Sequence, residues 1–162
     1  MKITTVLVPL DGSSLAEAAL GPAVEFARDN EAQLVLVRAA EAHPIPGADP
    51  TEAQVEVVRK AEEYLEGVRA RVKSAGVSAI ETSVWYGPPA EAIVDCARFR
   101  HADLIVMSTH GRSGLGRLVL GSVAETVLRA THTPIFLLRP EGAPVTRLAA
   151  GQARPAKEAS HV

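Results

Sequence analysis

The chain has 162 residues, of which 47% are hydrophobic and only 4% aromatic. It is therefore long enough for one domain whose core is built mainly from aliphatic side chains. The 17 basic and 19 acidic residues give a formal net charge of −2, which provides no electrostatic support for nucleic-acid binding. No stretch approaches the roughly 18 consecutive apolar residues of a membrane span, and the chain opens with a strand pattern instead of a signal peptide.

A single cysteine, Cys96, excludes an internal disulfide and favours a reducing compartment, so we expect a cytoplasmic protein. Cys96 stands among apolar neighbours in a predicted helix, and we expect it to be packed in the core and unreactive.

The first part of the chain alternates strand and helix patterns. Residues 3–9 form a β-branched run that predicts a buried strand ended by Pro9 and a turn. Ser13 or Ser14 is expected to cap one helix that continues to residue 27, with Glu17 completing a capping box. Residues 34–37 predict the second strand. Residues 43–50 contain three prolines and predict a loop.

The second part continues the alternation. Residues 51–74 predict a long amphipathic helix, stopped by Gly76, whose outer face carries solvated charges of both signs. Strands are predicted at residues 79–86, 104–107 and 135–138, and helices at 90–100 and 123–130. Residues 141–162 are rich in Ala, Pro, Gly and charge, and we expect a flexible tail there, after a domain spanning residues 1–140.

The order βαβαβαβαβ predicts an α/β fold, an open parallel sheet with right-handed crossovers and helices on both faces. In such sheets ligands bind outside the carboxyl ends of the strands, where the strand order reverses. The loops after the first and fourth strands are therefore the candidate binding loops.

The loop after the fourth strand has features of an anion site. It contains Gly111, Gly114 and Gly121 and leads into a helix that starts near Ser122. Glycine lets the backbone approach a polyanion closely, and a helix amino terminus presents unpaired N–H groups. Arg112 and Arg117 in the same loop can add positive charge. The loop has no Walker pattern, and no GxGxxG comes after the first strand.

These residues resemble the universal stress protein family. Its ATP-binding members carry G-x2-G-x9-G-[ST] after the fourth strand, and Gly111, nine residues and Gly121-Ser122 match the last part of that pattern. Ser108 stands where the pattern begins with glycine. Residues 6–13 (VLVPLDGS) and 87–93 (GPPAEAI) resemble two further family segments, so the resemblance covers about residues 2–140.

The resemblance implies a Rossmann-like five-stranded sheet of order 3-2-1-4-5 and a homodimer, commonly paired through the last strands; residues 134–138 are the candidate edge. It also implies binding of ATP, ADP or AMP, with Mg²⁺ as a possible companion, in stress response or signalling without fast turnover. Two alternatives stay open. One is a slow ATPase or nucleotide-transferring enzyme. The other is an interaction module that binds no nucleotide, which stays open because Ser108 replaces the first glycine of the pattern.

The resemblance assigns Asp11 to the ribose hydroxyls, the backbone at Leu10 and Ala39 to adenine, and Gly111, Gly121 and Ser122 to the phosphates. Ser122 and Glu125 also fit a capping box. His110 lacks a paired carboxylate, so we expect a structural hydrogen bond from it more than catalysis. The full set of candidate contact residues is Pro9, Leu10, Asp11, Ala39, Ser108, His110, Gly111, Arg112, Gly114, Gly121, Ser122 and Val123.

Overall fold

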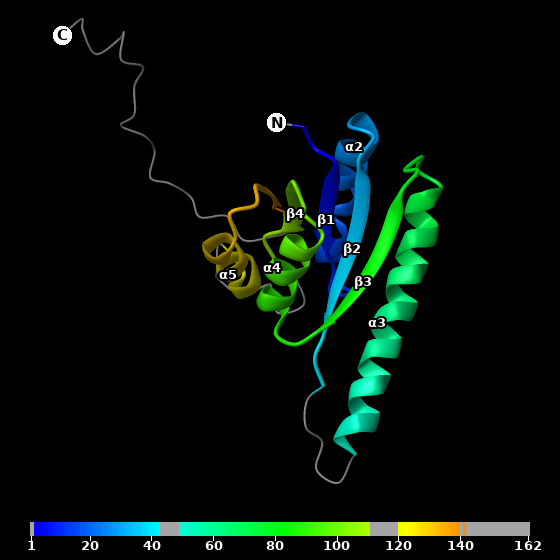
Figure 1. Ribbon diagram of the computed structural model, residues 1–162, viewed down its shortest axis with the longest axis vertical. Coiled ribbons are helices and arrows are strands. Elements are labelled where there is room, and N and C mark those ends of the chain that lie inside the picture. Colours follow the sequence, from blue (N-terminus) through cyan, green and yellow to red (C-terminus); the bar gives the residue numbers. More distant parts are fainter. Residues whose placement is uncertain (1, 43–48, 111–119, 140, 142–162) are drawn as a thin grey trace, which may run out of the picture.

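The computed structural model describes residues 2–42, 49–110, 120–139 and 141, and its elements alternate along the chain (Figure 1). In chain order they are β1 (Thr5–Pro9), α1 (Ser14–Glu17), α2 (Leu20–Asp29), β2 (Gln33–Ala40), α3 (Pro50–Lys73), β3 (Ile80–Tyr86), α4 (Pro89–Phe99), β4 (Leu104–Ser108), α5 (Ser122–Ala130) and β5 (Ile135–Leu138). The strands form one parallel sheet of order β3-β2-β1-β4-β5. The predicted α/β class and strand order are confirmed.

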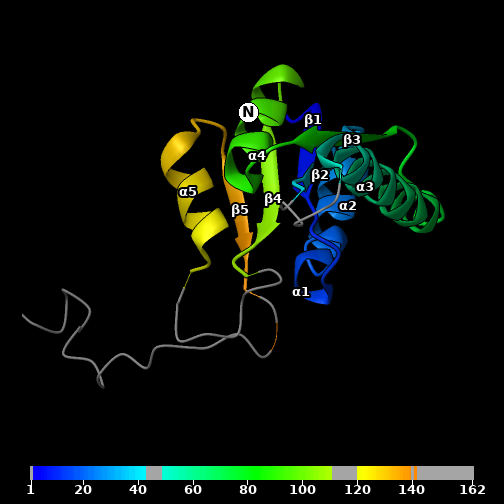
Figure 2. The same cartoon turned by 90° about the horizontal axis from the view of Figure 1, so that it is seen from below.

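Helices cover both faces of the sheet: α1, α2 and α3 lie on one side, and α4 and α5 on the other (Figure 2). Every residue of β1 is buried, and its side chains alternate between the two layers. Val6 and Val8 pack with the α2 and α3 side, whereas Leu7 packs with the α4 and α5 side. Both cores are mainly aliphatic, as a parallel sheet covered on both faces requires.

The strand order reverses beside β1, which pairs with β2 on one side and β4 on the other. Pro9 lies opposite Val37, and the Leu10 N–H donates to the Val37 carbonyl at 2.8 Å, so the pairing continues past the end of the strand. The carboxyl ends of β1, β2 and β4 therefore meet at one edge of the sheet. This is the place where open α/β sheets bind ligands.

The single helix predicted for residues 14–27 is wrong, because the chain forms two helices there, α1 and α2. Pro22 lies in the first turn of α2, where it has no N–H to donate to the Ala18 carbonyl, and its ring obstructs a helix continuing from residue 18. Ser13 is the N-cap of α1 and accepts from the Ala16 N–H at 3.1 Å. The capping box with Glu17 is also wrong, since that carboxylate accepts from Tyr64 and Arg71.

The helices α3, α4 and α5 each begin one residue earlier than predicted. The loop predicted for residues 43–50 ends early, because Pro50 is the first residue of α3 and Asp49 caps it, accepting from the Thr51 N–H at 2.7 Å. Proline suits this position, where its missing N–H would have no helical partner. The helix α5 begins at Ser122 with Gly121 as N-cap. The capping box expected of Ser122 and Glu125 is therefore wrong. Residues 43–48 and 142–162 lie outside the described residues.

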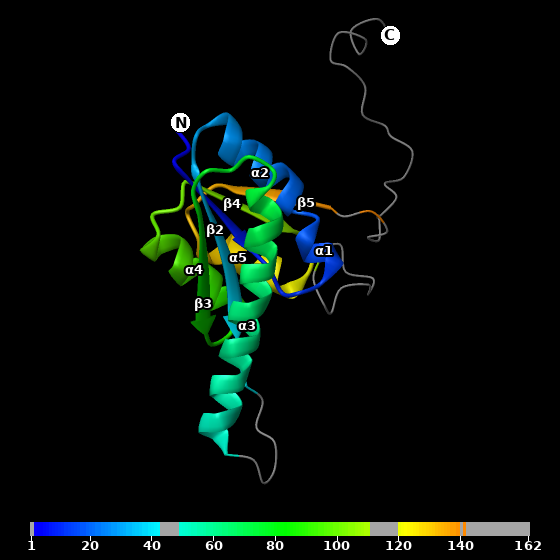
Figure 3. The same ribbon diagram turned by 90° about the vertical axis from the view of Figure 1, so that its right-hand side faces the viewer.

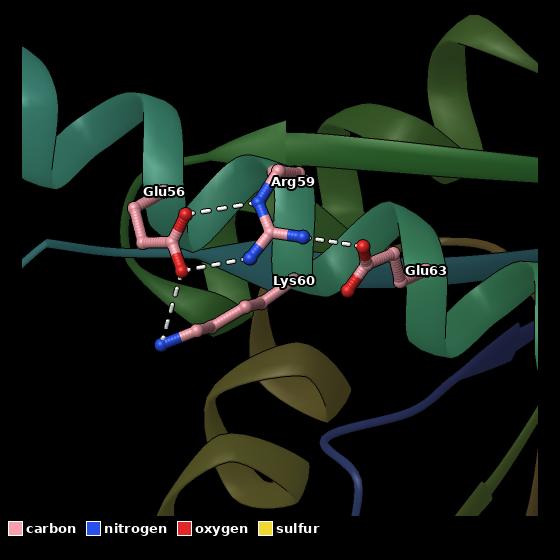
Figure 4. Close-up of polar contacts among 4 residues, drawn as sticks. All are labelled: Glu56, Arg59, Lys60 and Glu63. Carbon is pink, nitrogen blue, oxygen red and sulfur yellow. Dashed lines mark hydrogen bonds and ion pairs between the residues drawn. The ribbon is translucent and has the colours of Figure 1, made fainter.

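The outer face of α3 carries charges of both signs, as predicted (Figure 4). Arg59 donates to Glu56 at 2.8 and 2.9 Å and pairs with Glu63, and Lys60 lies 3.3 Å from Glu56. These hydrogen bonds lower the pKa of Glu56 to about 2. Exposed ion pairs of this kind contribute little to stability. The helix α3 extends beyond the ends of β2 and β3 (Figure 3).

Cys96 is free and fully buried, which confirms its predicted packing, and burial raises the pKa of its thiol. Within the part of the chain that the structure describes, no helix combines the length and apolarity that a membrane span requires.

Asp103 joins the starts of β1 and β4. Its Oδ2 accepts from the Thr4 N–H at 2.8 Å, the Thr4 hydroxyl at 2.6 Å and the Thr5 N–H at 3.1 Å. The Asp103 N–H donates in turn to the Thr5 carbonyl at 3.0 Å. The bonds from Thr4 hold the pKa of Asp103 below its ordinary value, because they stabilise the carboxylate form.

We expect Asp103→Asn to lower the free energy of unfolding by about 1 kcal/mol at pH 7, because the bonds to a charged acceptor are replaced by weaker ones. Since folding lowers this pKa, the stabilisation is complete above the pKa of an unfolded aspartate, about 3.9, and is lost as the pH falls through the lower pKa of the folded chain. Urea unfolding between pH 7 and 3 measures this. A difference that persists unchanged at low pH, or an equal effect of Asp95→Asn on the surface of α4, contradicts the account.

Candidate functional site

A cleft of about 310 Å³ opens at the carboxyl edge of the sheet. Its walls come from the ends of β1, β2 and β4 and from the first turns of α4 and α5. The cleft contains nine of the predicted contact residues, Pro9, Leu10, Asp11, Ala39, Ser108, His110, Gly121, Ser122 and Val123. The other three, Gly111, Arg112 and Gly114, lie outside the described residues, as does Arg117.

Asp11 sits in the turn between β1 and α1, and hydrogen bonds fix its carboxylate. Its Oδ1 accepts from the Ser13 N–H at 2.9 Å and from the Ser13 hydroxyl at 2.6 Å. The turn bends at Gly12, whose φ of 88° favours glycine. Because Ser13 also caps α1, the carboxylate in the cleft and the helix behind it share one hydrogen-bonded turn.

The end of β4 provides a buried polar wall formed by Ser108, Thr109 and His110. The Ser108 hydroxyl accepts from the His110 N–H at 3.2 Å, and His110 Nδ1 and the Thr109 hydroxyl share a hydrogen bond of 3.0 Å. His110 thus makes a side-chain hydrogen bond of the kind expected, and its structural role stays a prediction. Ser108 is not among the described non-glycine residues with positive φ, which are Glu31 and His101. A serine in place of the first motif glycine therefore causes no backbone strain here.

The start of α5 is held against β4 by close backbone contact. The Gly121 N–H donates to the Thr109 carbonyl at 2.8 Å, and a Cβ at Gly121 would lie only 2.8 Å from the same oxygen. Glycine is thus required by space at this position. As N-cap it offers no side chain to the first turn of α5, and Ser122 and Val123 of that turn line the cleft. A helix amino terminus of this kind favours anions.

The prediction missed several residues of the cleft. Arg38 precedes Ala39 in β2, Glu41 directly follows the strand, and Thr109 lies between two residues that were predicted. Their places at strand ends could have identified them. Pro89 and Ile93 contribute from α4, and both lie in the GPPAEAI segment that carried the family resemblance without receiving a role.

The described cleft is electrostatically mixed. Two carboxylates, Asp11 and Glu41, and one guanidinium, Arg38, lie at the β1 and β2 end, while the amino terminus of α5 lies at the β4 end. Across the described ranges, no group of three or more His, Cys, Asp or Glu side chains could hold a metal ion. The arrangement places charged side chains at one end of the cleft and a helix amino terminus at the other.

Comparisons with known proteins agree on one family. The model of the universal stress protein family matches residues 2–139. A universal stress protein of Methanocaldococcus jannaschii is 33% identical over 139 residues, which cover 83% of this chain and 81% of that protein. The solved structure of the universal stress protein UspA from Lactobacillus plantarum has a TM-score of 0.76 at 26% identity, covering 86% of this chain and 99% of the other.

Complexes with adenine nucleotides are among the similar structures. A universal stress protein in complex with cAMP has a TM-score of 0.69 at 26% identity, covering 86% of this chain and 99% of the other. A family protein from Arabidopsis thaliana with AMP bound has a TM-score of 0.63 and covers 86% of this chain and 93% of the other. At 16% identity it is similar in fold alone.

We expect Gly121→Ala to lower the free energy of unfolding by about 1 to 3 kcal/mol, because the new Cβ must displace the Thr109 carbonyl or the start of α5. Gly67→Ala is the matched control: no atom lies within 4 Å of its Cβ, and the residue is in the middle of α3. There alanine should stabilise by up to about 1 kcal/mol. Urea unfolding of both variants measures the difference. Equal effects at the two positions would show that the close approach at Gly121 is unimportant.

Proposed function

The chain belongs to the universal stress protein family, and from that premise we propose that it binds ATP, ADP or AMP in the cleft at the carboxyl edge of its sheet. One observation carries the proposal: Asp11 and the amino terminus of α5 border the same cleft of about 310 Å³. A nucleotide needs an acceptor for its ribose hydroxyls and donors for its phosphates, and this pair supplies both. The cAMP bound by a similar universal stress protein supports the choice of base.

At the nucleoside end, Asp11 accepts hydrogen bonds from the ribose hydroxyls. Ser13 already orients the Asp11 carboxylate, so binding a ribose costs little conformational entropy of this side chain. The backbone at Leu10 and Ala39 flanks the adenine ring, and Pro9 completes this wall. Ala39 is small, which leaves room for a flat base.

At the phosphate end, the N–H groups of Ser122 and Val123 and the Ser122 hydroxyl bind the phosphates, with Gly121 allowing close approach. Gly111, Gly114 and Arg112 complete the phosphate loop in this proposal. Ser108 and His110 support the loop from β4, where they bond to each other.

The protein acts in this proposal as a cytoplasmic nucleotide-binding protein of stress response or signalling, folded over residues 1–140, without fast turnover. It forms a homodimer through the edge strand β5 (Ile135–Leu138). Mg²⁺, which keeps several waters and prefers phosphate oxygens, would be held chiefly by the nucleotide, since the described cleft offers only the carboxylates of Asp11 and Glu41.

Isothermal titration calorimetry with ATP, ADP and AMP tests the proposal. We expect a dissociation constant below 1 mM for at least one of them, which corresponds to a binding free energy of more than about 4 kcal/mol. Asp11→Asn keeps the acceptor for Ser13 but loses the charge, and should weaken binding about tenfold. Asp29→Ala, at the far end of α2, is the control and should bind like the wild type. No binding near millimolar ligand would favour an interaction module instead.

Incubation with labelled ATP and Mg²⁺ tests the absence of fast turnover. We expect hydrolysis well below roughly 1 per second, the lower limit of ordinary enzyme rates. A rate at or above that value would contradict the proposal and identify the protein as an enzyme.

A further inference from the structure

We infer that Tyr64 is a positioning residue for the nucleotide cleft, which holds the Arg38 guanidinium at the cleft edge and fixes α1 behind the Asp11 turn. The inference rests on the proposed function and deepens it. Tyr64 lies on α3 and is not among the residues that line the cleft, so it would act through its neighbours.

The first link is a cation–π contact. The guanidinium carbon of Arg38 lies 4.7 Å from the centre of the Tyr64 ring. Arg38 is the one Lys or Arg among the described residues that line the cleft, where the carboxylates of Asp11 and Glu41 also lie. An arginine side chain has many rotamers, and an aromatic face restricts them while favouring the charge. The ring therefore restricts the position of a cation that lines the same cleft as the two carboxylates.

The second link runs through Glu17 to α1. The Tyr64 hydroxyl donates to Glu17 Oε1 at 2.8 Å, and Arg71 donates to Glu17 Oε2 at 2.8 Å. α1 has only four residues, too few for a helix to be stable by itself. It shares Ser13 with the Asp11 turn. Two bonds from α3 thus hold the helix to which the ribose-binding turn is attached.

The protonation state of Tyr64 suits this role. Burial and the hydrogen bond to Glu17 raise the pKa of its hydroxyl, with Asp11 acting in the same direction and Arg38 against it. The hydroxyl therefore stays protonated and remains a donor to Glu17 at physiological pH.

A side chain that only fills the core would behave differently. Tyr64 is partly buried and packs against the core layer of α2 and α3, so its removal lowers stability in either case. Positioning adds a charge-dependent effect: a displaced Arg38 no longer offsets Asp11 and Glu41, so an anionic ligand loses more affinity than a neutral one. Comparing AMP with adenosine, which shares the nucleoside but lacks the phosphate, separates the two roles.

Calorimetry with AMP and adenosine on the full chain tests the inference. We expect Tyr64→Leu to weaken AMP about threefold to tenfold and adenosine less than about threefold. Tyr64→Phe keeps the ring under Arg38 but loses the bond to Glu17, and should weaken both ligands equally, by about twofold to threefold. If Tyr64→Leu does not fold, the affinities of Tyr64→Phe still test the inference.

Arg38→Met and the double variant complete a double-mutant cycle. Only the Glu17 part of Tyr64's effect is independent of Arg38, so the double variant should bind AMP about twofold to threefold more weakly than Arg38→Met alone. Phe99→Leu is the control, since Arg100 lies 5.6 Å above its ring in the same kind of contact, on α4 and away from the cleft. It should bind AMP like the wild type.

Three results overturn the inference. The first is that the folded Tyr64 variants bind AMP as tightly as the wild type. The second is that Tyr64→Leu loses equal affinity for AMP and for adenosine. The third is that the loss of AMP affinity in the double variant equals the product of the two single losses. In each, the wild type still binds AMP and the proposed function stands. A wild type that binds neither ligand overturns both proposals together.

Discussion

The central position of β1 constrains the rest of the structure. This strand is short, wholly buried, and paired in parallel with β2 on one side and β4 on the other. A parallel strand in the middle of a sheet must bury both of its faces, and the β-branched, aliphatic run at residues 5–9 has nothing polar to oppose this except Thr5. Once β1 is central, the chain must cross over on both sides. The loops after β1 and β4 then open onto the same edge.

The site depends on that edge and on one close backbone contact. The cleft exists because α5 starts directly above the end of β4, where Gly121 approaches the Thr109 carbonyl without a side chain between them. This contact fixes the first turn of α5, whose Ser122 and Val123 line the same cleft as Asp11. Opposite, the Ser13 bonds give Asp11 a fixed orientation. The two ends of the cleft are thus ordered independently of each other, one by backbone packing and one by a side-chain turn.

Periodicity and turn residues predicted all five strands, because buried aliphatic runs bounded by Gly, Pro and Asp permit few other structures. The strand order came from the family resemblance. The local patterns failed where a local capping rule competes with a contact that is distant in sequence. Ser14 and Glu17 fit a capping box, but Glu17 is drawn to Tyr64 and Arg71, which are distant in sequence. Likewise Ser122 fits an N-cap, yet the approach to Thr109 makes Gly121 the cap. The cleft residues near strand ends were predictable by position. Arg38 was not, since its role depends on a ring on α3 that no local pattern connects to it.

The central claim is that an adenine nucleotide occupies the cleft between Asp11 and the start of α5. Titration of the ¹⁵N-labelled protein with AMP, monitored by two-dimensional NMR, tests it most directly, because each backbone amide reports its own surroundings. The account predicts saturable shifts at Asp11, Ser13, Ser122 and Val123, with the exposed outer face of α3 around Arg59 unaffected. Saturable shifts confined to other surfaces, or none at millimolar AMP, would contradict it.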